Sequence, residues 1–549
     1  MTQTPSTPSQ PPIETDPVAS GAGAPNSGQG GLARSAGPIS AATFMSRILG
    51  FVRDVLIARA FGSGLVTDAF FVAFAIPSMF RRLLTEGALT SAFIPVHSDV
   101  RAEKGERAAR AFSGAMAVSL AAFLAVFCLL GIYFARPLVA LLAPGFSADP
   151  KKLGLTADLT RIMFPFLFFI GLSAIAVGVL NAARRFFLPA LAPVIQNVAM
   201  IGALVAAGAY AVGGGAVYWL AWGVVLGGAF QLIVHFPLMA KLGVTPLPSL
   251  PWRVPSVGRC LSLMGPAAFG AAILQVNVLI DRWLASFLQE GSISYLYYAN
   301  RLVQFPHGIL SVAVAAAAFP LLADRAAIGR HGGTDDPRGS PGPLAEAGRL
   351  TLFITLPAAF GLMALAQPIM EVLFERGAFG AADTAASAAA LRAYALGLVF
   401  FGLVRILVVA YHARLDTKYP VRCANWSVLA NVALSVTLMI PFGYVGLALA
   451  TSIASGLNAW LLFRGLGGSA EWPREDLGRA IKSLLPISLL MGGLVYAGNA
   501  LIWPVSGVIW LRAGILCAEV ILGIGVYLLL SWLFVPELKG MLRAIPRKA

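Results

Sequence analysis

Runs of about twenty apolar residues recur along most of the chain, and each is long enough to cross the hydrocarbon core of a bilayer as a helix. Only 12% of the residues are charged, whereas soluble domains carry roughly 25%. The alternating ten-residue pattern that is typical of a membrane β-barrel does not occur in the sequence. The sequence therefore predicts an all-α polytopic membrane protein and excludes an ordinary soluble fold.

Length and hydropathy predict about fourteen transmembrane helices. Their expected limits are 41–62, 66–98, 110–142, 156–180, 188–212, 216–240, 258–289, 294–323, 347–375, 384–411, 421–440, 443–465, 480–503 and 508–535. The long polar segment 325–349 is rich in Gly and Pro, which indicates a linker between two halves.

Two motifs recur about six spans apart and divide the chain in the same way. NAARRFFLPALAPVIQNVAM at 181–200 resembles YHARLDTKYPVRCANWSVLANVAL at 411–434, and AFIPVHSD at 92–99 resembles AFPLLAD at 318–324. An even offset preserves orientation, so the repeats are predicted to be parallel, with binding sites between them near mid-membrane.

The predicted organisation follows from the spans, the linker and the repeat. An N-terminal six-helix lobe covers 41–242, a C-terminal six-helix lobe covers 258–465, and two extra helices cover 480–535. Residues 1–40 are rich in Pro, Ser, Gly and Thr and are predicted to form a disordered cytoplasmic tail, with a second tail at 536–549.

The net charge of +15 has a spatial explanation. If the N-terminus is cytoplasmic, most loop Lys and Arg residues fall on the cytoplasmic side, as the positive-inside rule requires. Both termini are therefore predicted to be cytoplasmic, and orientation rather than nucleic-acid binding accounts for the basicity.

Several arginines lie inside apolar spans, within SRILGFVRD at 46–54, within the block at 67–95 and within YYANRLVQFPHGIL at 297–310. Each costs about 2.5–3.5 kcal/mol near a bilayer centre, so it must face water, a counter-charge or an anion. Pairing along the helix accounts for Arg82, which lies four residues before Glu86. The other arginines are Arg47, Arg53, Arg81 and Arg301. We expect them to line a polar cavity and to bind a diphosphate, because one guanidinium group can donate two hydrogen bonds to phosphate oxygens.

Asp281 lies deep in the seventh predicted span and has two interpretations. It pairs with Arg282 or reaches the interface, or it forms a sodium or proton site with the polar residues Asn431 and Thr451.

Motifs of catalysis are missing from the sequence. It contains neither GxxxxGK[ST] nor HExxH nor GxSxG, and its five histidines have no ligand spacing. The chain is predicted not to be an enzyme. The alternatives that remain are a multidrug or cation antiporter, which the arginines disfavour, a flippase for a lipid-linked oligosaccharide, and a non-catalytic scaffold of the cell-wall machinery.

The segments SRILGFVRD, TDAFFVAFAIPSMFRRLLTEGALTSAFIPV and YYANRLVQFPHGILSVAVAAAAFP resemble the signatures of the MurJ (MviN) lipid II flippases, and the resemblance covers about 41–535. It implies the fold of the multidrug/oligosaccharidyl-lipid/polysaccharide exporter superfamily, with a lipid-tail groove at the last two helices. The implied substrate is undecaprenyl-diphosphate-linked GlcNAc-MurNAc-pentapeptide, moved from the cytoplasmic to the periplasmic leaflet of the bacterial inner membrane.

The same resemblance assigns residues and partners. Family positions that contact or gate the headgroup fall on Arg47, Arg53, Asp54, Asp68, Arg81, Glu86 and Arg301. The sodium site of some members falls on Asp281, Asn431, Ser435 and Thr451, although Ser435 stands where such members can have Asp. No cofactor is implied beyond a sodium ion or the membrane potential. The expected partners are lipid II, membrane lipids and cell-wall synthesis proteins.

Overall fold

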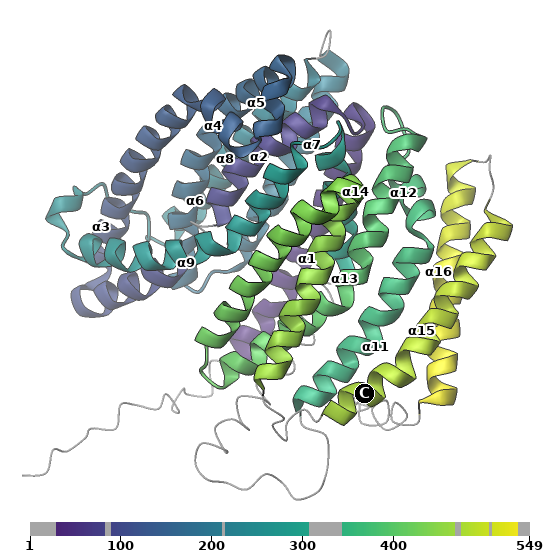
Figure 1. Cartoon of the computed structure of the whole chain (residues 1–549). Coiled ribbons are helices and arrows are strands. Elements are labelled where there is room, and N and C mark those ends of the chain that lie inside the picture. Colours follow the sequence, from purple (N-terminus) through teal and green to yellow (C-terminus); the bar gives the residue numbers. More distant parts are fainter. Residues whose placement is uncertain are drawn as a thin grey trace, which may run out of the picture.

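The computed structural model describes residues 29–82, 89–210, 215–306, 343–466, 474–503 and 508–535, which form helices and connecting turns without a strand (Figure 1). Within these ranges, nine helical segments are long and apolar enough to cross a membrane. The predicted class, a helical membrane protein, is confirmed, whereas these ranges do not fix the number of spans at fourteen.

The helices form three groups along the chain. The first half comprises α1 (Gln29–Phe61), α2 (Leu65–Arg82), α3 (Leu89–Tyr133), α4 (Ala135–Leu142), η2 (Pro144–Ala148), α5 (Pro150–Met163), α6 (Pro165–Ala182), α7 (Phe187–Tyr210) and α8 (Ala216–Lys241). The second half comprises η3 (Pro251–Arg253), α9 (Ser256–Ala285), a helix described over 292–306, α11 (Pro343–Ala364), α12 (Ala366–Phe374), α13 (Ala381–Ala413) and α14 (Lys418–Gly465). The C-terminal pair is α15 (Arg474–Ile502) and α16 (Ile509–Phe534).

Several boundaries differ from the predicted ones. The first helix begins at Gln29 instead of residue 41, because Leu32, Ala33 and Ala36 are good helix formers that extend it into the expected tail. Residues 1–28 lie outside the described part. Two predicted spans, 421–440 and 443–465, fall in one element, α14, which is broken at Gly443 by a backbone φ of 55°.

The helices form two bundles side by side, with α15 and α16 at the outer edge of the second (Figure 1). One buried cluster is shared by both halves and includes Phe70, Phe71, Tyr298 and Phe374. A second cluster belongs to the first half but also contains residues from the first turns of α9, such as Cys260. The helix α9 therefore connects the two bundles, and its C-terminal half lies at their interface.

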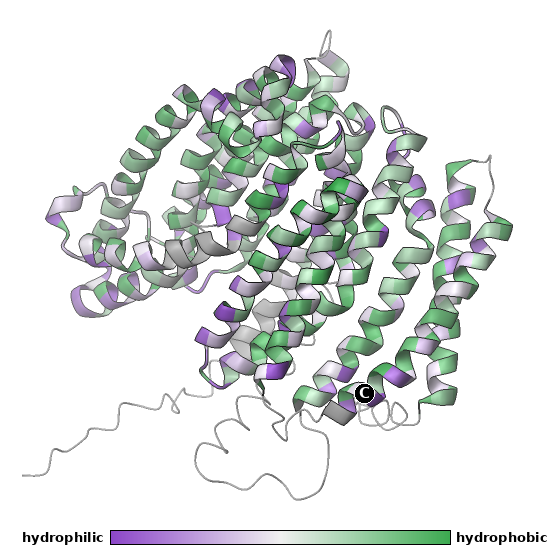
Figure 2. Cartoon of the chain, viewed as in Figure 1, coloured by the Kyte–Doolittle hydropathy of each residue, from purple (hydrophilic) through white to green (hydrophobic). Residues whose placement is uncertain are grey.

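The two C-terminal helices turn a wide apolar surface outward. The buried residues of α16 form one stripe, Leu516, Glu519, Gly523, Tyr527 and Ser531, that faces its neighbours. Most of its other side chains are exposed and apolar, and hydrophobic residues run along the lengths of the helices (Figure 2). This surface suits contact with lipid.

The two turns of the predicted repeat share a backbone geometry. Arg184 after α6 and Leu415 after α13 have φ values of 57° and 62°, and they are the non-glycine residues with positive φ in the described ranges. In both turns the next amide donates to a carbonyl five residues back, at 2.8 Å in the first and 3.0 Å in the second. This is the Schellman arrangement that ends helices, and in each turn a proline follows the positive-φ residue by five positions.

Candidate substrate cavity between the two halves

A cavity of about 430 Å³ lies between the two bundles. Its wall combines α1, α2, α7 and α8 of the first half with α9, the 292–306 helix and α13 of the second. Six arginines reach it, while Asp281 is the acidic residue among the lining side chains; the arginines are Arg47, Arg53, Arg81, Arg82, Arg282 and Arg301. We call this space the arginine cavity. Its lining carries a strong excess of positive charge.

Helical periodicity explains how the second half reaches the cavity. The lining residues of α9 are Val278, Asp281, Arg282 and Ala285, which follow the i, i+3, i+4, i+7 pattern of one helix face. The 292–306 helix repeats the pattern with a stripe that contains Tyr297 and Arg301. Each helix thus presents one polar face to the cavity.

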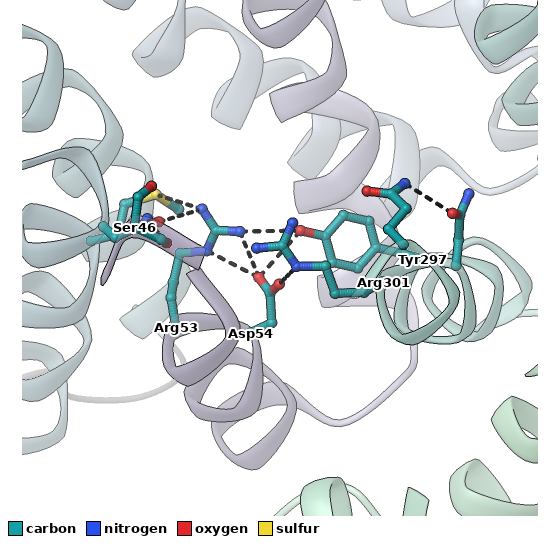
Figure 3. A network of polar contacts seen from close by, with 9 residues as sticks. Ser46, Arg53, Asp54, Tyr297 and Arg301 are labelled. Atoms are coloured by element: carbon teal, nitrogen blue, oxygen red, sulfur yellow. Dashed lines mark hydrogen bonds and ion pairs between the residues drawn. The ribbon is translucent and has the colours of Figure 1, made fainter. Parts of the chain in front are cut away.

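Arg53, Asp54 and Arg301 form the polar centre between the halves (Figure 3). The Nε and Nη2 atoms of Arg53 donate to Asp54 Oδ1 at 3.0 and 2.6 Å, and Tyr297 Oη donates to the same oxygen at 3.2 Å. Arg301 Nε lies 3.0 Å from Asp54 Oδ2. One fully buried carboxylate is therefore shared by two arginines from opposite halves, which leaves a net positive charge.

Neighbouring groups hold this cluster in place. Arg53 Nη1 donates to Asn197 Oδ1 at 2.9 Å, and Asn197 Nδ2 donates to the backbone oxygen of Ser46 at 3.1 Å. Gly50 makes room for Arg301, because a Cβ at Gly50 would lie 2.5 Å from Arg301 Nη2. The glycine of the SRILGFVRD motif thus allows an arginine of the other half to approach α1.

Three further arginines of the cavity are not neutralised within the described ranges. Arg47 and Arg282 make no hydrogen bond or ion pair with a described residue. Arg82 has one contact, a long hydrogen bond of 3.5 Å to Gln275 Oε1. These guanidinium groups are available to an anion, which they can bind with charge-assisted hydrogen bonds.

One end of the bundle is closed by contacts between the halves, and we call it the closed end. It is where the backbone of Arg59 and residues 62–68 and 144–152 of the first half meet 286–294 and 376–383 of the second. Among the described residues, every hydrogen bond from α1–α8 to the chain beyond α9 falls here or in the Arg53–Asp54–Arg301 cluster.

Asp68 is the central acid of the closed end. Its Oδ2 accepts from Lys152 Nζ and from the Gly291 amide, both at 2.9 Å. Its Oδ1 accepts from the Ser294 amide at 3.0 Å and from Ser294 Oγ at 2.7 Å. Asp68 thereby supplies a negative charge to the N-terminus of the 292–306 helix, where the helix dipole favours one.

Comparison with known proteins gives the family. The protein-family model described as lipid II flippase MurJ matches residues 57–511 of the chain. The chain is 35% identical over 524 residues to the probable lipid II flippase MurJ of Vibrio cholerae. The aligned region covers 92% of this chain and 96% of that protein. It is 37% identical over 465 residues to the lipid II flippase MurJ of Burkholderia cenocepacia, covering 83% and 88%.

The chain belongs to the MurJ family. A solved lipid II flippase MurJ in an inward closed conformation superposes with a TM-score of 0.76 at 29% identity, covering 91% of this chain and 99% of that one. An inward-facing multidrug transporter of the MATE family has a TM-score of 0.61 at 13% identity, covering 80% and 96%, and shares the fold alone.

The residues that the MurJ resemblance assigned to the headgroup occupy three places. Arg47, Arg53, Arg81 and Arg301 line the arginine cavity, and Asp54 lies directly behind Arg53 and Arg301. Asp68 is not on the cavity wall but at the closed end, because its oxygens face Lys152 and the start of the 292–306 helix. Glu86 lies outside the described residues, so its pairing with Arg82 stays a prediction; the side chain of Arg82 reaches the cavity.

Sequence reasoning overlooked part of the cavity wall. It treated Arg282 only as a partner of Asp281, and it did not consider Gln196 and Gln231, whose side chains are joined by a hydrogen bond of 2.7 Å. The signal for Arg282 was present, since it shares a helix face with Val278 and Asp281. The two glutamines come from separate helices, and only packing reveals that they meet.

The sodium site of some MurJ members is only partly represented here. Asn431 Nδ2 donates to Asp281 Oδ1 at 2.9 Å, so these two residues do meet. Asp281 has a second carboxylate oxygen, and Ser435 Oγ is buried without a hydrogen-bond partner among the described residues; a hard cation is bound by oxygen atoms of these kinds. Thr451 Oγ1 donates to the Leu447 carbonyl, and no described hydrogen bond joins it to the pair. The sodium site stays a prediction.

Proposed function

We propose that the protein moves lipid II from the cytoplasmic to the periplasmic leaflet of the inner membrane by alternating access. The observation that carries the proposal is the cavity between the halves, which six arginines and one aspartate line. A diphosphate is a dense anion that several guanidinium groups can bind together. The excess of arginine also disfavours the cationic substrates of a multidrug antiporter.

In the proposed mechanism, the diphosphate first meets Arg47, which has no partner among the described residues. It then competes with Asp54 for Arg301, whose side chain is 31% exposed and is held by a single ion pair. Arg53 is bound more firmly, through two hydrogen bonds to Asp54 and one to Asn197. Substrate binding therefore loosens the contact between Asp54 and Arg301, which is one of the links between the halves.

Loss of that link favours separation of the halves at the closed end, so that the cavity opens toward the opposite leaflet. The prenyl tail stays in the lipid and needs no desolvation, and the exposed apolar faces of α15 and α16 suit contact with it. With the closed end on the periplasmic side, both termini lie in the cytoplasm, in agreement with the positive-inside rule. No catalytic step is required.

The test uses Arg47→Gln in a strain whose only copy of the gene encodes this variant. Arg47 makes no polar contact in the described structure, so the substitution should leave folding intact. We expect lipid-linked precursor to accumulate on the cytoplasmic side, as detected by leaflet-specific labelling. Arg59→Gln, an exposed change on the same helix, is the matched control. An unchanged leaflet distribution with Arg47→Gln at native expression would contradict the proposal.

A further inference from the structure

Arg282 lines the arginine cavity but is not part of the Arg53–Asp54–Arg301 cluster. It lies on the α9 wall, on the same helix face as Val278 and Ala285. It has no hydrogen bond or ion pair with a described residue. The neighbouring carboxylate, Asp281, is directed toward Asn431 instead, at 2.9 Å.

The electrostatic surroundings of Arg282 favour an incoming anion. The titratable groups that act on it are Tyr297, Arg82, Asp281 and Tyr394. Two arginines are thus opposed by one carboxylate, and the hydroxyl of Tyr394 can donate a hydrogen bond to an anion. A charged side chain inside a membrane protein is normally a functional group.

This wall differs from the one that carries the Arg53–Asp54–Arg301 cluster. Arg53 comes from α1 and Arg301 from the 292–306 helix, whereas Arg282 comes from α9 and faces the cavity together with Tyr394 of α13. A headgroup bound at the cluster would therefore have a further cationic group, from another helix, within the same cavity.

We propose that Arg282 binds a carboxylate of the peptide carried by the substrate headgroup. This inference rests on the proposed function, in which the headgroup is a diphosphate-linked disaccharide with a pentapeptide. A peptide ends in a carboxylate, and guanidinium and carboxylate groups pair through two parallel hydrogen bonds. Arg282 would thus recognise the peptide of the headgroup, while Arg47, Arg53 and Arg301 hold the diphosphate.

The test compares three ligands bound to the purified full-length protein: undecaprenyl diphosphate, lipid II, and lipid II whose peptide carboxylates have been amidated. Native mass spectrometry gives the three dissociation constants. We expect Arg282→Gln to weaken lipid II binding roughly ten-fold to a hundred-fold, the range for a lost charge-assisted hydrogen bond, and to leave undecaprenyl diphosphate binding unchanged. Arg282→Lys should recover part of the affinity. Arg259→Gln, on the exposed surface of the same helix, is the matched control.

A second measurement does not depend on the folding of a variant. The unmodified protein should bind amidated lipid II more weakly than lipid II by the same factor. An equal loss for undecaprenyl diphosphate and lipid II with Arg282→Gln would place Arg282 at the diphosphate and overturn the proposal. It would also be overturned if neither amidation nor substitution changed lipid II binding. Failure of the unmodified protein to bind either diphosphate ligand would instead refute the proposed function.

Discussion

Asp54 determines how much of the positive charge in the cavity is available. It is fully buried and forms ion pairs with both Arg53 and Arg301, while Tyr297 donates a further hydrogen bond to its Oδ1. A carboxylate shared in this way keeps two arginines in position without cancelling their combined charge. Arg53 and Asp54 are adjacent in the sequence, but their partners Asn197, Tyr297 and Arg301 come from distant helices.

Asp54→Asn should strengthen diphosphate binding, because the anion no longer has to displace a carboxylate from Arg301. Removing this competition is worth about 1–2 kcal/mol, or roughly a ten-fold lower dissociation constant for undecaprenyl diphosphate. Transport should slow, since release of the substrate is hindered. Titration of the purified variant measures the affinity, with Glu103→Gln, an exposed change on α3 outside the cavity, as a control. Weaker binding by Asp54→Asn would contradict the competition between Asp54 and substrate.

At the scale of elements, the closed end depends on a buried ion pair that joins α2, α5 and the 292–306 helix. Lys152 and Asp68 have side-chain exposures of 10% and 1%, and their contact is 2.9 Å long. Asp68 also accepts from two backbone amides at the start of the 292–306 helix. Removing one partner of a buried pair leaves the other charge uncompensated, which is the costly event.

Asp68→Asn should therefore destabilise the closed end by about 3–5 kcal/mol relative to the separated halves. Hydrogen–deuterium exchange at the Ser294 amide measures this directly, because that amide donates to Asp68. We expect exchange to accelerate there, and the double variant Asp68→Asn/Lys152→Met to exchange more slowly than the single one. Asp158→Asn removes an exposed pair on α5 and should have little effect. Unchanged exchange at Ser294 in Asp68→Asn would exclude a role for this acid in closure.

The backbones of the two halves also approach closely at the closed end. A Cβ at Gly145 would lie 2.0 Å from the Ser286 carbonyl oxygen, and the Gly145 amide donates to Ser286 Oγ at 3.1 Å. A side chain at this position would force the η2 segment away from the end of α9. No flexible group is available to yield, because the nearest atoms are backbone.

Gly145→Ala should consequently shift the protein toward a state with a separated closed end. Spin labels at Lys151 and Arg376, one on each half, would report a longer distance by double electron–electron resonance. Gly154→Ala on α5 is the control, since nothing lies within 4 Å of its Cβ position. The close approach would have no role in closure if both alanine variants gave the distance distribution of the unmodified protein.

For the whole molecule, we propose that the arginine excess couples transport to the membrane potential. When the empty cavity changes the leaflet it faces, its net positive charge moves through part of the electric field. One charge crossing 100 mV corresponds to about 2.3 kcal/mol. A potential that is negative on the cytoplasmic side thus favours the return of the empty cavity to that side.

In proteoliposomes, imposing such a potential should raise the rate of repeated lipid II transfer. A potassium diffusion potential and leaflet-specific labelling provide the measurement. Replacing sodium by choline on both sides should leave the rate unchanged, because the potential acts on the charge of the cavity itself. A transfer rate that depends on sodium and does not change with the imposed potential would contradict the proposed energy source.

The helical membrane class could be predicted from the sequence because the bilayer acts on each span separately. A span must satisfy its own backbone hydrogen bonds and present enough apolar surface, and both requirements are visible in about twenty consecutive residues. The unusual arginines at 47, 53, 81 and 301 were visible for the same reason, since charge is rare in such a segment. Family membership followed from the motifs that contain them.

Only the tertiary structure decided which of these charges are paired and which face the cavity. Asp54 holds Arg301 from the other half, Asp68 holds Lys152 at the closed end, and Arg282 faces the cavity beside the Asp281–Asn431 pair. Such outcomes depend on which helices meet across the interface. Coulomb interactions act over a few ångströms in space, whatever the separation along the chain, so neither spacing nor hydropathy within one span could specify them.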